Sequence, residues 1–338
     1  MKYALLFLSC LCVMACGDRE PRVVQNQKVG NAFGTSYSLI YQTDRTLDLQ
    51  KEIDSVFEAV NRSLSTYIPD SDISRINYGD TTISVDHMFQ DVFKLSKEIH
   101  AKTNGYFDPT VGVLVNAWGF GPENQIAMDS SRVDSLLHFV GFDKVYLTES
   151  NSISKSNPNI RIDFNAIAKG YGIDRLAVLM DEKGVGDYLL EVGGEVVAKG
   201  ENQIKKKPWV VGIDDPQVVE GRALKTTIKM KDIALASSGN YRKFRIDSAS
   251  GQKYVHTIDP KTGFTKSGNT LAATVLANSC AKADGYATAL MALDLAMAEK
   301  LVLSEKDLEA YIIYLDENGE TQEFMTEGFR RLVFEPRE

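Results

Sequence analysis

The middle of the chain contains the segment Arg161-Ile-Asp-Phe-Asn-Ala-Ile-Ala-Lys-Gly-Tyr-Gly-Ile-Asp174, where a strand is predicted to end and a helix to begin. A helix start offers unpaired backbone N–H groups and the positive end of the helix dipole, which suit an anion such as phosphate. Lys169 and Gly170 fit such a phosphate site, and Asp163 fits a ribose or ring group. The segment matches neither common glycine-rich nucleotide motif. Taken alone, a capped amphipathic helix without a ligand explains it equally well.

Three further segments bear on whether the first segment binds a ligand. An alanine-rich helix is predicted to open with Ala283-Asp-Gly-Tyr-Ala-Thr288. A strand is predicted to run into a turn at His256-Thr-Ile-Asp-Pro-Lys-Thr-Gly263, because Asp, Pro and Gly favour turns. The third segment, Asn104-Gly-Tyr-Phe-Asp-Pro-Thr-Val111, leads to Trp118-Gly-Phe-Gly121. Each segment is a weak signal by itself, whereas the ordered series is specific.

The composition indicates a globular protein and argues against nucleic-acid binding. The chain has 338 residues, of which 43% are hydrophobic and 25% charged, values that are ordinary for a protein with a substantial core. Its formal net charge is -8, and the basic triplet Lys205-Lys-Lys207 precedes a proline and is predicted to be a solvated turn. We therefore expect no basic surface for nucleic acid. The length permits one large domain or two smaller ones.

The first residues have the features of a bacterial lipoprotein signal peptide, predicted over residues 1–15. An apolar run over 4–14 follows an early lysine and is too short to span a bilayer. The run ends in Val13-Met-Ala-Cys16, which resembles a lipobox. Because Met14 is an unusual residue at its place in that motif, plain secretion is the alternative.

The mature chain is expected to begin at a lipidated Cys16, followed by a tether over residues 16–30 that anchors the protein to a membrane. Cys10 and Cys12 leave with the leader, so only Cys280 keeps a thiol and no intrachain disulfide is possible. Since Cys280 lies among small residues, we expect it to be packed and not reactive.

Hydrophobic periodicity predicts a mixture of helices and strands. Helices are predicted over 48–64, 89–99, 133–140, from the segment 161–174 to residue 184, and over 284–303. Strands are predicted over 36–42, 188–192, 209–213, 224–230, 243–246, 270–277, 311–315 and 321–325. Ser304 and Asp307 form a capping box for a further short helix, and Asn318-Gly319 is typical of a hairpin turn. Helices and strands do not alternate strictly, which favours an α+β fold over a doubly wound parallel sheet.

In their order along the chain, the four segments resemble the ApbE family of FAD:protein FMN transferases. The resemblance covers residues 31–333 and includes four shorter motifs: Gly34-Thr35, Ser65-Thr-Tyr67, Val192-Gly-Gly194 and Ser238-Gly-Asn-Tyr241. It implies a single domain over residues 31–338 with an α+β fold related to the tunnelling fold. In that fold, mixed or antiparallel sheets are flanked by helices.

A magnesium site is the first functional implication. Asp284 and Thr288 are four residues apart on a predicted helix, so both side chains share one face and offer the hard oxygen donors that Mg²⁺ prefers. The spacing alone favours a helix-start carboxylate beside a core threonine. The resemblance implies instead that both residues bind Mg²⁺ together with the main-chain carbonyl of Ala166. Some relatives carry an acidic residue where this chain has Ala287, which leaves the number of protein ligands open.

The resemblance also implies that FAD is bound by residues from several motifs: Phe33, Tyr67, Trp118, Gly119, Phe120, Asp163, Lys169 and Ile258. The alternative for the aromatic residues is core packing. A glycine-flanked aromatic pair at 118–121 argues against that alternative, since it is expected to pack poorly without a ligand. Asn165 stands where the family usually has glycine before Ala166, and asparagine tolerates a left-handed backbone.

His256 is the candidate general base, because the family places this histidine beside the flavin pyrophosphate. The alternative is a structural histidine on a strand. The other histidines, His87, His100 and His138, are predicted to lie on helices away from every motif and receive no role.

The implied reaction is Mg²⁺-dependent transfer of FMN from FAD to a threonine hydroxyl of a partner protein, with release of AMP. The chain contains no acceptor motif of the Ser/Thr-Gly-Ala-Thr kind, so the acceptor is expected to be another protein, such as a periplasm-facing subunit of a redox pump. The protein is then expected in the bacterial cell envelope, lipid-anchored and facing the periplasm. Two alternatives remain: hydrolysis of FAD to FMN and AMP, and a lipoprotein that binds FAD without chemistry.

Overall fold

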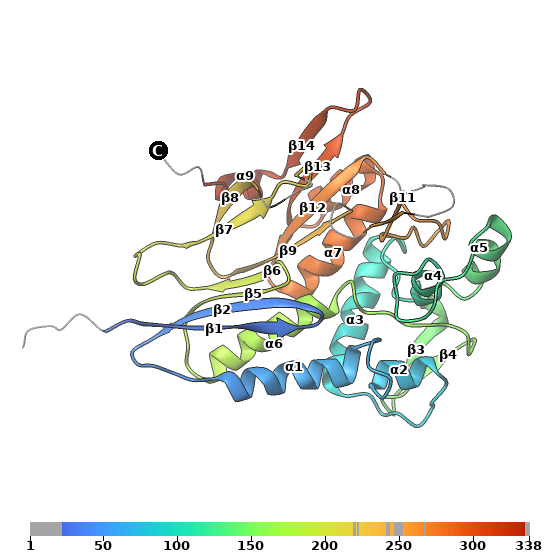
Figure 1. Cartoon of the computed structure of the whole chain (residues 1–338), viewed down its shortest axis with the longest axis horizontal. Coiled ribbons are helices and arrows are strands. Elements are labelled where there is room, and N and C mark those ends of the chain that lie inside the picture. The colour runs from blue at the N-terminus through green and yellow to red at the C-terminus, as the bar shows by residue number, and fades with distance from the viewer. Residues whose placement is uncertain are drawn as a thin grey trace, which may run out of the picture.

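A mixed helix and sheet architecture surrounds one antiparallel sheet of eight strands (Figure 1). The structure is a computed structural model and describes residues 22–218, 221, 223–240, 244–246, 253–266 and 268–334. The strands lie in the order β1-β2-β5-β6-β9-β12-β13-β14. They span β1 (Val24–Ala32), β2 (Thr35–Thr43), β5 (Asp187–Val192), β6 (Glu195–Lys199), β9 (Ile233–Gly239), β12 (Thr270–Ala277), β13 (Glu309–Leu315) and β14 (Thr321–Met325).

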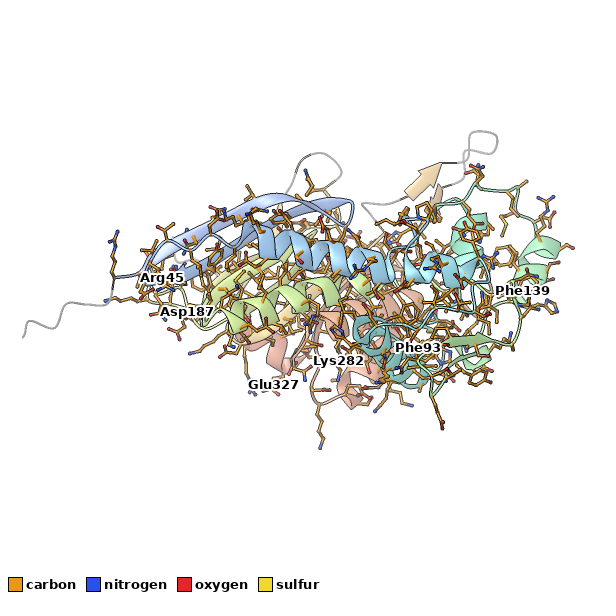
Figure 2. All side chains as sticks on the ribbon, turned by 90° about the horizontal axis from the view of Figure 1, so that it is seen from below. Arg45, Phe93, Phe139, Asp187, Lys282 and Glu327 are labelled. Atoms are coloured by element: carbon orange, nitrogen blue, oxygen red, sulfur yellow. The ribbon has the colours of Figure 1, made fainter. Side chains whose placement is uncertain are left out.

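Helices cover one face of this sheet and gather at one end of the molecule (Figure 1). Along the face lie α1 (Gln50–Leu64), α6 (Ala168–Glu182) and α7 (Cys280–Ala292), followed by α8 (Leu295–Ser304). The end group comprises α2 (Asp72–Asn77), α3 (His87–Lys102), α4 (Gly112–Ala117) and α5 (Ser130–Leu137), with the short hairpin β3 (Val145–Leu147) and β4 (Ile153–Lys155). Figure 2 shows α1 and α6 side by side, with Arg45 and Asp187 at one end of the molecule and Phe139 at the other.

The opposite face of the sheet is covered by the hairpin of β7 (Trp209–Asp214) and β8 (Leu224–Met230) and by α9 (Glu327–Leu332). Strand β13 shows how one strand serves both cores. Tyr311 and Ile313 pack with Phe329 of α9, whereas Ala310 and Ile312 belong to the core that contains α7. This alternation follows from the period of two along a strand, and both faces of the sheet are thereby buried.

The predicted α+β class with antiparallel sheets is confirmed, because every pair of named strands is antiparallel. Strands β8, β12 and β14 have the predicted bounds. A small two-stranded sheet, β10 (Phe244–Ile246) with β11 (Lys253–Val255), precedes His256. Within the described ranges, no helix is both long enough and apolar enough to cross a membrane.

The predicted tether over residues 16–30 is wrong for its second half. Residues 24–30 belong to β1, which pairs with β2 along its whole length. The strand lies at the edge of the sheet and carries mostly polar side chains, with Val29 exposed. An edge strand of this kind has no clear alternation of apolar residues, so its periodicity resembles that of a linker. Residues 1–15 and Cys16 lie outside the described part of the chain.

The predicted helix over 284–303 is two helices. Helix α7 begins four residues earlier than predicted, because the Ser279 side chain caps it by accepting the N–H of Lys282. It ends at Ala292, since Leu293 has an extended backbone, and α8 begins after Asp294. The helix predicted after Ser304 is absent: a turn leads directly into β13, and Asp307 forms an ion pair with Lys282 of α7 instead of a capping box.

Candidate functional site

The starts of helices α6 and α7 lie against each other and form the centre of the candidate site. The N–H of Gly170, in the first turn of α6, donates to Oδ2 of Asp284 on α7 at 3.1 Å. A Cβ at Gly170 would lie 2.4 Å from the carbonyl oxygen of Cys280, so only glycine permits this approach. The strand predicted before α6 is reduced to one isolated bridge between Arg161 and Val111.

The two side chains predicted to bind magnesium occupy one stretch of α7, and the third ligand position lies nearby. Asp284 is buried and Thr288 half-buried one turn later. The Thr288 hydroxyl lies 3.4 Å from the hydroxyl of Ser238 in β9. Ala166 belongs to the turn that precedes α6, four residues before Gly170. All three predicted positions are therefore carried by elements that meet at Gly170.

Glu195, at the start of β6, is a residue of this site that the sequence reasoning missed. Its Oε1 forms an ion pair with the ammonium of Lys169 in the first turn of α6. Its Oε2 is buried and has no hydrogen-bond partner in the described part of the chain. A carboxylate directly after the quoted motif Val192-Gly-Gly194 was the available signal. Lys169 is consequently held by a carboxylate and is not an isolated phosphate ligand.

The charged side chains of Asp284, Lys169 and Glu195 influence one another's pKa values. Burial raises the pKa of Asp284 to about 7, and Glu195 adds to this shift while Lys169 opposes it. Burial alone would lower the pKa of Lys169, but the carboxylates of Asp284 and Glu195 outweigh burial and raise it. The site thus holds two carboxylates around one ammonium, an arrangement that favours an additional cation.

These residues fit a bound Mg²⁺ by their donor chemistry. Within the described residues there is no cluster of three or more His, Cys, Asp or Glu side chains that could hold a metal. A carboxylate, a hydroxyl and a main-chain carbonyl are oxygen donors of the kind that Mg²⁺ accepts, with water in its remaining positions. The unpartnered Oε2 of Glu195 is a buried polar atom that a cation and its waters would satisfy.

A second group of predicted residues meets next to the turn 163–166. Tyr67 is 59% exposed, and its hydroxyl donates to the carbonyl of Phe120 at 3.3 Å. Burial raises the pKa of Tyr67, and the negative charge of Asp163 adds to this shift. Asn165 donates to the Thr66 hydroxyl at 3.2 Å. An exposed aromatic ring and a half-buried carboxylate are thus available to a planar ligand.

The environment of Trp118 in the structure differs from the predicted one. It is only 4% exposed, packs with Ile258 and Leu114, and donates its ring N–H to the carbonyl of Gly263 at 2.9 Å. The expectation that this aromatic residue packs poorly without a ligand is therefore wrong, and its ring is not an open stacking surface. Gly119 has a φ of +80°, which gives the loop its sharp turn. The loop offers a ligand its backbone and Phe120.

Phe33 lies in the two-residue turn between β1 and β2, with a φ of +52°. Its ring packs edge-on against Phe57 at 5.2 Å between centroids. A Cβ added at Gly172 of α6 would lie 2.5 Å from the same ring. The side chain thus packs between the turn and two helices, and its predicted contact with FAD remains a prediction.

His256 follows β11 and is half-buried. Its neighbour Thr257 donates to the side-chain carbonyl of Asn240 at 2.8 Å, which brings His256 to the motif that begins at Ser238. Tyr241, the last residue of that motif, lies outside the described residues. The motif therefore contacts both the residue after His256 and Thr288 of the candidate metal site.

The expectation that His100 lies away from every motif is wrong. Its Nε2 is 3.3 Å from Oδ2 of Asp108, which belongs to the segment 104–111. Asn104 and Gly105 both have positive φ, so the chain reverses directly after α3 and returns Asp108 to the last helical turn. The contact is structural, because Asp108 also accepts the N–H groups of Thr110 and Phe142.

Replacing Gly170 with alanine is expected to lower the free energy of unfolding by up to about 2 kcal/mol. Overpacking against backbone atoms costs about 1–3 kcal/mol, and the roughly 1 kcal/mol that alanine gains in a helix offsets part of that cost. Chemical denaturation measures the change. Gly186→Ala is the matched control, since Gly186 is exposed and a Cβ there meets nothing within 4 Å. Equal stability of the two variants would contradict the close approach of α6 and α7.

Fold and site together define an α+β protein with a candidate nucleotide site beside a candidate site for a cation with oxygen ligands. The family model of the ApbE family matches residues 33–312, and the chain belongs to this family. The FAD:protein FMN transferase of Haemophilus influenzae is 33% identical over 322 residues, which cover 91% of each chain. The FAD:protein FMN transferase of Vibrio cholerae is 35% identical over 301 residues, covering 87% of this chain and 88% of the relative.

Solved structures agree with this assignment. The flavin transferase ApbE from Vibrio cholerae superposes with a TM-score of 0.81 at 31% identity, over 92% of this chain and 99% of that one. The apo form of the Pseudomonas stutzeri flavinyl transferase ApbE gives a TM-score of 0.80 at 26% identity, over 92% and 97%. Both likenesses span nearly the whole chain.

Proposed function

We propose that this protein is a Mg²⁺-dependent FAD:protein FMN transferase, which transfers FMN from FAD to a threonine hydroxyl of a partner protein. One observation carries the proposal in a chain of this family: Asp284 and Thr288 lie one turn apart on α7 at the point where α6 begins. A protein that only stored FAD would not require a carboxylate and hydroxyl pair suited to magnesium. Relatives that cover most of the chain are named FAD:protein FMN transferases.

The proposed roles follow from where the side chains lie. Asp284, Thr288 and the carbonyl of Ala166 would hold Mg²⁺, which when bound supplies Lewis-acid stabilisation of negative charge on the pyrophosphate. Lys169, paired with Glu195, would contribute a positive charge beside the phosphates. The positive end of the α6 dipole would lie beside the same anionic group, although the Gly170 N–H in its first turn already donates to Asp284.

The remaining predicted residues would position the two ring systems of FAD. Tyr67 offers an exposed aromatic face, Phe120 lines the adjacent loop, and Asp163 offers a polar group just before α6. The backbone of Gly119 and the side chains of Phe33 and Ile258 would complete the surface. Trp118 would support the loop from the protein interior and would not stack on the ligand.

His256 would act as general base on the acceptor threonine. Its imidazole takes the hydroxyl proton, the threonine oxygen forms a bond to the flavin-side phosphorus, and the bond from that phosphorus to the bridging oxygen breaks. AMP leaves, and the product is a protein with FMN attached through a phosphoester. A nearby carboxylate is the alternative base.

One incubation tests the proposal against its two alternatives. The mature protein is mixed with FAD and Mg²⁺, with and without an acceptor that carries a threonine motif. Yellow fluorescence that stays on the acceptor in a denaturing gel supports transfer. Release of AMP without acceptor supports hydrolysis of FAD instead. If neither signal is seen, the protein binds FAD without chemistry.

The partner and the location are further parts of the proposal. The acceptor would be a periplasm-facing subunit of a redox pump, and lipidated Cys16 would hold the enzyme at a membrane of the cell envelope. Two acyl chains or more give the stable anchoring that a single chain does not.

We expect Cys16→Ser to release an active enzyme into the soluble periplasmic fraction, because the change removes the only thiol that would carry lipid. Fractionation followed by the transfer assay measures both properties. Cys12→Ser is the control, since it makes the same substitution inside the leader and should leave the protein with the membranes. Membrane-bound Cys16→Ser protein would contradict the lipobox.

A further inference from the structure

Near its start, each of the helices α6 and α7 carries an aspartate whose carboxylate accepts backbone N–H groups from the first turn of the other helix. Asp284 of α7 accepts the N–H of Gly170 in the first turn of α6. In return, Asp174 in the second turn of α6 accepts the N–H of Cys280 and of Ala281, both at 2.8 Å. The first N–H groups of a helix have no partner within the helix, so each of these bonds replaces a cap.

The four leading N–H groups of α7 are all satisfied, and Asp174 accounts for half of them. The Ser279 side chain accepts from Lys282, and the Ser279 carbonyl accepts from Ala283 at 3.1 Å. Asp174 accepts from the remaining two, at Cys280 and Ala281. Because both of these residues are buried, water is not expected to replace the carboxylate there.

Asp174 is also costly to keep in this position. Burial raises its pKa to about 6, although the two N–H donors counteract part of that shift. A buried carboxylate is tolerated when its hydrogen bonds compensate for lost solvation. The arrangement additionally offsets the positive ends of two helix dipoles that lie side by side.

From this geometry we infer that Asp174 is a positioning residue for the metal site, an inference that rests on the proposed binding of Mg²⁺ by Asp284 and Thr288. Asp174 holds the first turn of α7, and Asp284 lies one turn further along the same helix. The bond from Gly170 engages Oδ2 of Asp284 and leaves Oδ1 for a ligand. If the first turn loosens, the Asp284 carboxylate loses its fixed orientation relative to α6.

Loss of Asp174 is therefore expected to weaken metal binding without removing a ligand. Residues that orient metal ligands typically change affinity by about 10–100-fold when they are replaced. For Asp174→Ala we expect the dissociation constant of Mn²⁺ to rise at least about tenfold. The turnover at saturating metal should recover most of the wild-type value, because the Asp284 and Thr288 ligands remain.

Titration of the full mature chain with Mn²⁺, followed by electron paramagnetic resonance, measures this affinity directly and without turnover. Asp174→Asn, which keeps one acceptor oxygen in the same volume, should lie between wild type and Asp174→Ala. Asp181→Asn is the control on the same helix, since Asp181 pairs with Lys199 and Tyr188 away from the site. Its affinity for Mn²⁺ should equal that of the wild type.

The variant Leu176→Ala distinguishes a general loss of stability from a loss of positioning at the metal site. Leu176 is fully buried in α6, and its truncation is expected to destabilise the protein by leaving a cavity while both carboxylates keep their bonds. This variant should bind Mn²⁺ like the wild type. Equal losses of affinity in Leu176→Ala and in both Asp174 variants would reduce Asp174 to a general stability residue and overturn the inference.

Two outcomes distinguish this inference from the proposed function. If Asp284→Ala abolishes Mn²⁺ binding and both Asp174 variants bind like wild type, the positioning role is wrong and the metal assignment stands. If Asp284→Ala binds Mn²⁺ as tightly as wild type, the metal assignment itself fails and the positioning role fails with it.

Discussion

Asp284→Ala is expected to lower the release of AMP from FAD by roughly a thousandfold, because a bound metal ion stabilises the transition state by several kcal/mol. The change removes the single carboxylate among the three proposed magnesium ligands. The affinity for FAD should weaken only modestly, since the residues proposed to contact the rings lie at Tyr67, Phe120 and Asp163. Steady-state release of AMP and a fluorescence titration with FAD measure the two quantities separately.

The matched control is Asp307→Ala. Asp307 also pairs with α7, through Lys282, but its side chain is half exposed and lies outside the proposed site. Its activity should remain near the wild-type value. A fully active Asp284→Ala enzyme would remove the metal assignment and with it the phosphoryl-transfer proposal.

His256→Ala is expected to reduce transfer of FMN to the acceptor about 10²–10⁴-fold, the usual contribution of a general base. Binding of FAD and of Mn²⁺ should change little, since neither Asp284 nor Thr288 is altered. Added imidazole should restore part of the rate if the lost group acts by taking a proton. The covalent fluorescence of the acceptor in a denaturing gel, followed over time, gives the rate.

His138→Ala serves as the control for this experiment, because His138 is exposed and its Nδ1 lies 2.8 Å from the carbonyl of Asp134 in its own turn. It should transfer at the wild-type rate. An unchanged rate in His256→Ala, or a loss that imidazole does not repair, would assign the proton to a nearby carboxylate.

Much of the site could be predicted because its residues occur in short segments with recognisable chemistry. The spacing of Asp284 and Thr288 placed both on one helical face, and the structure has them one turn apart. The role of the Trp118 ring was harder to predict. Glycines flank it in the sequence, but the residues that bury it, such as Ile258, lie about 140 residues away, and local pattern carries no sign of them.

Edge strands and breaks between consecutive helices were the features of the fold that the sequence predicted least well. Strand β1 is polar because it lies at the edge of the sheet, so it lacks the run of apolar residues that identified β12. The break at Leu293 and Asp294 separates two helices that are both rich in alanine and leucine, and composition alone does not show it. Such features depend on what the segment packs against.

By itself, the sequence determined the class of fold, the family and the kinds of donor available for chemistry, because these depend on residue type, order and short-range spacing. Tertiary structure decided how the donors are held. Lys169 is paired with Glu195, and α6 and α7 cap each other through Asp174 and Asp284, contacts that join residues 26, 106 and 114 positions apart. Hydrogen bonds between buried groups at such separations arise only when packing excludes water and brings the two helix starts together.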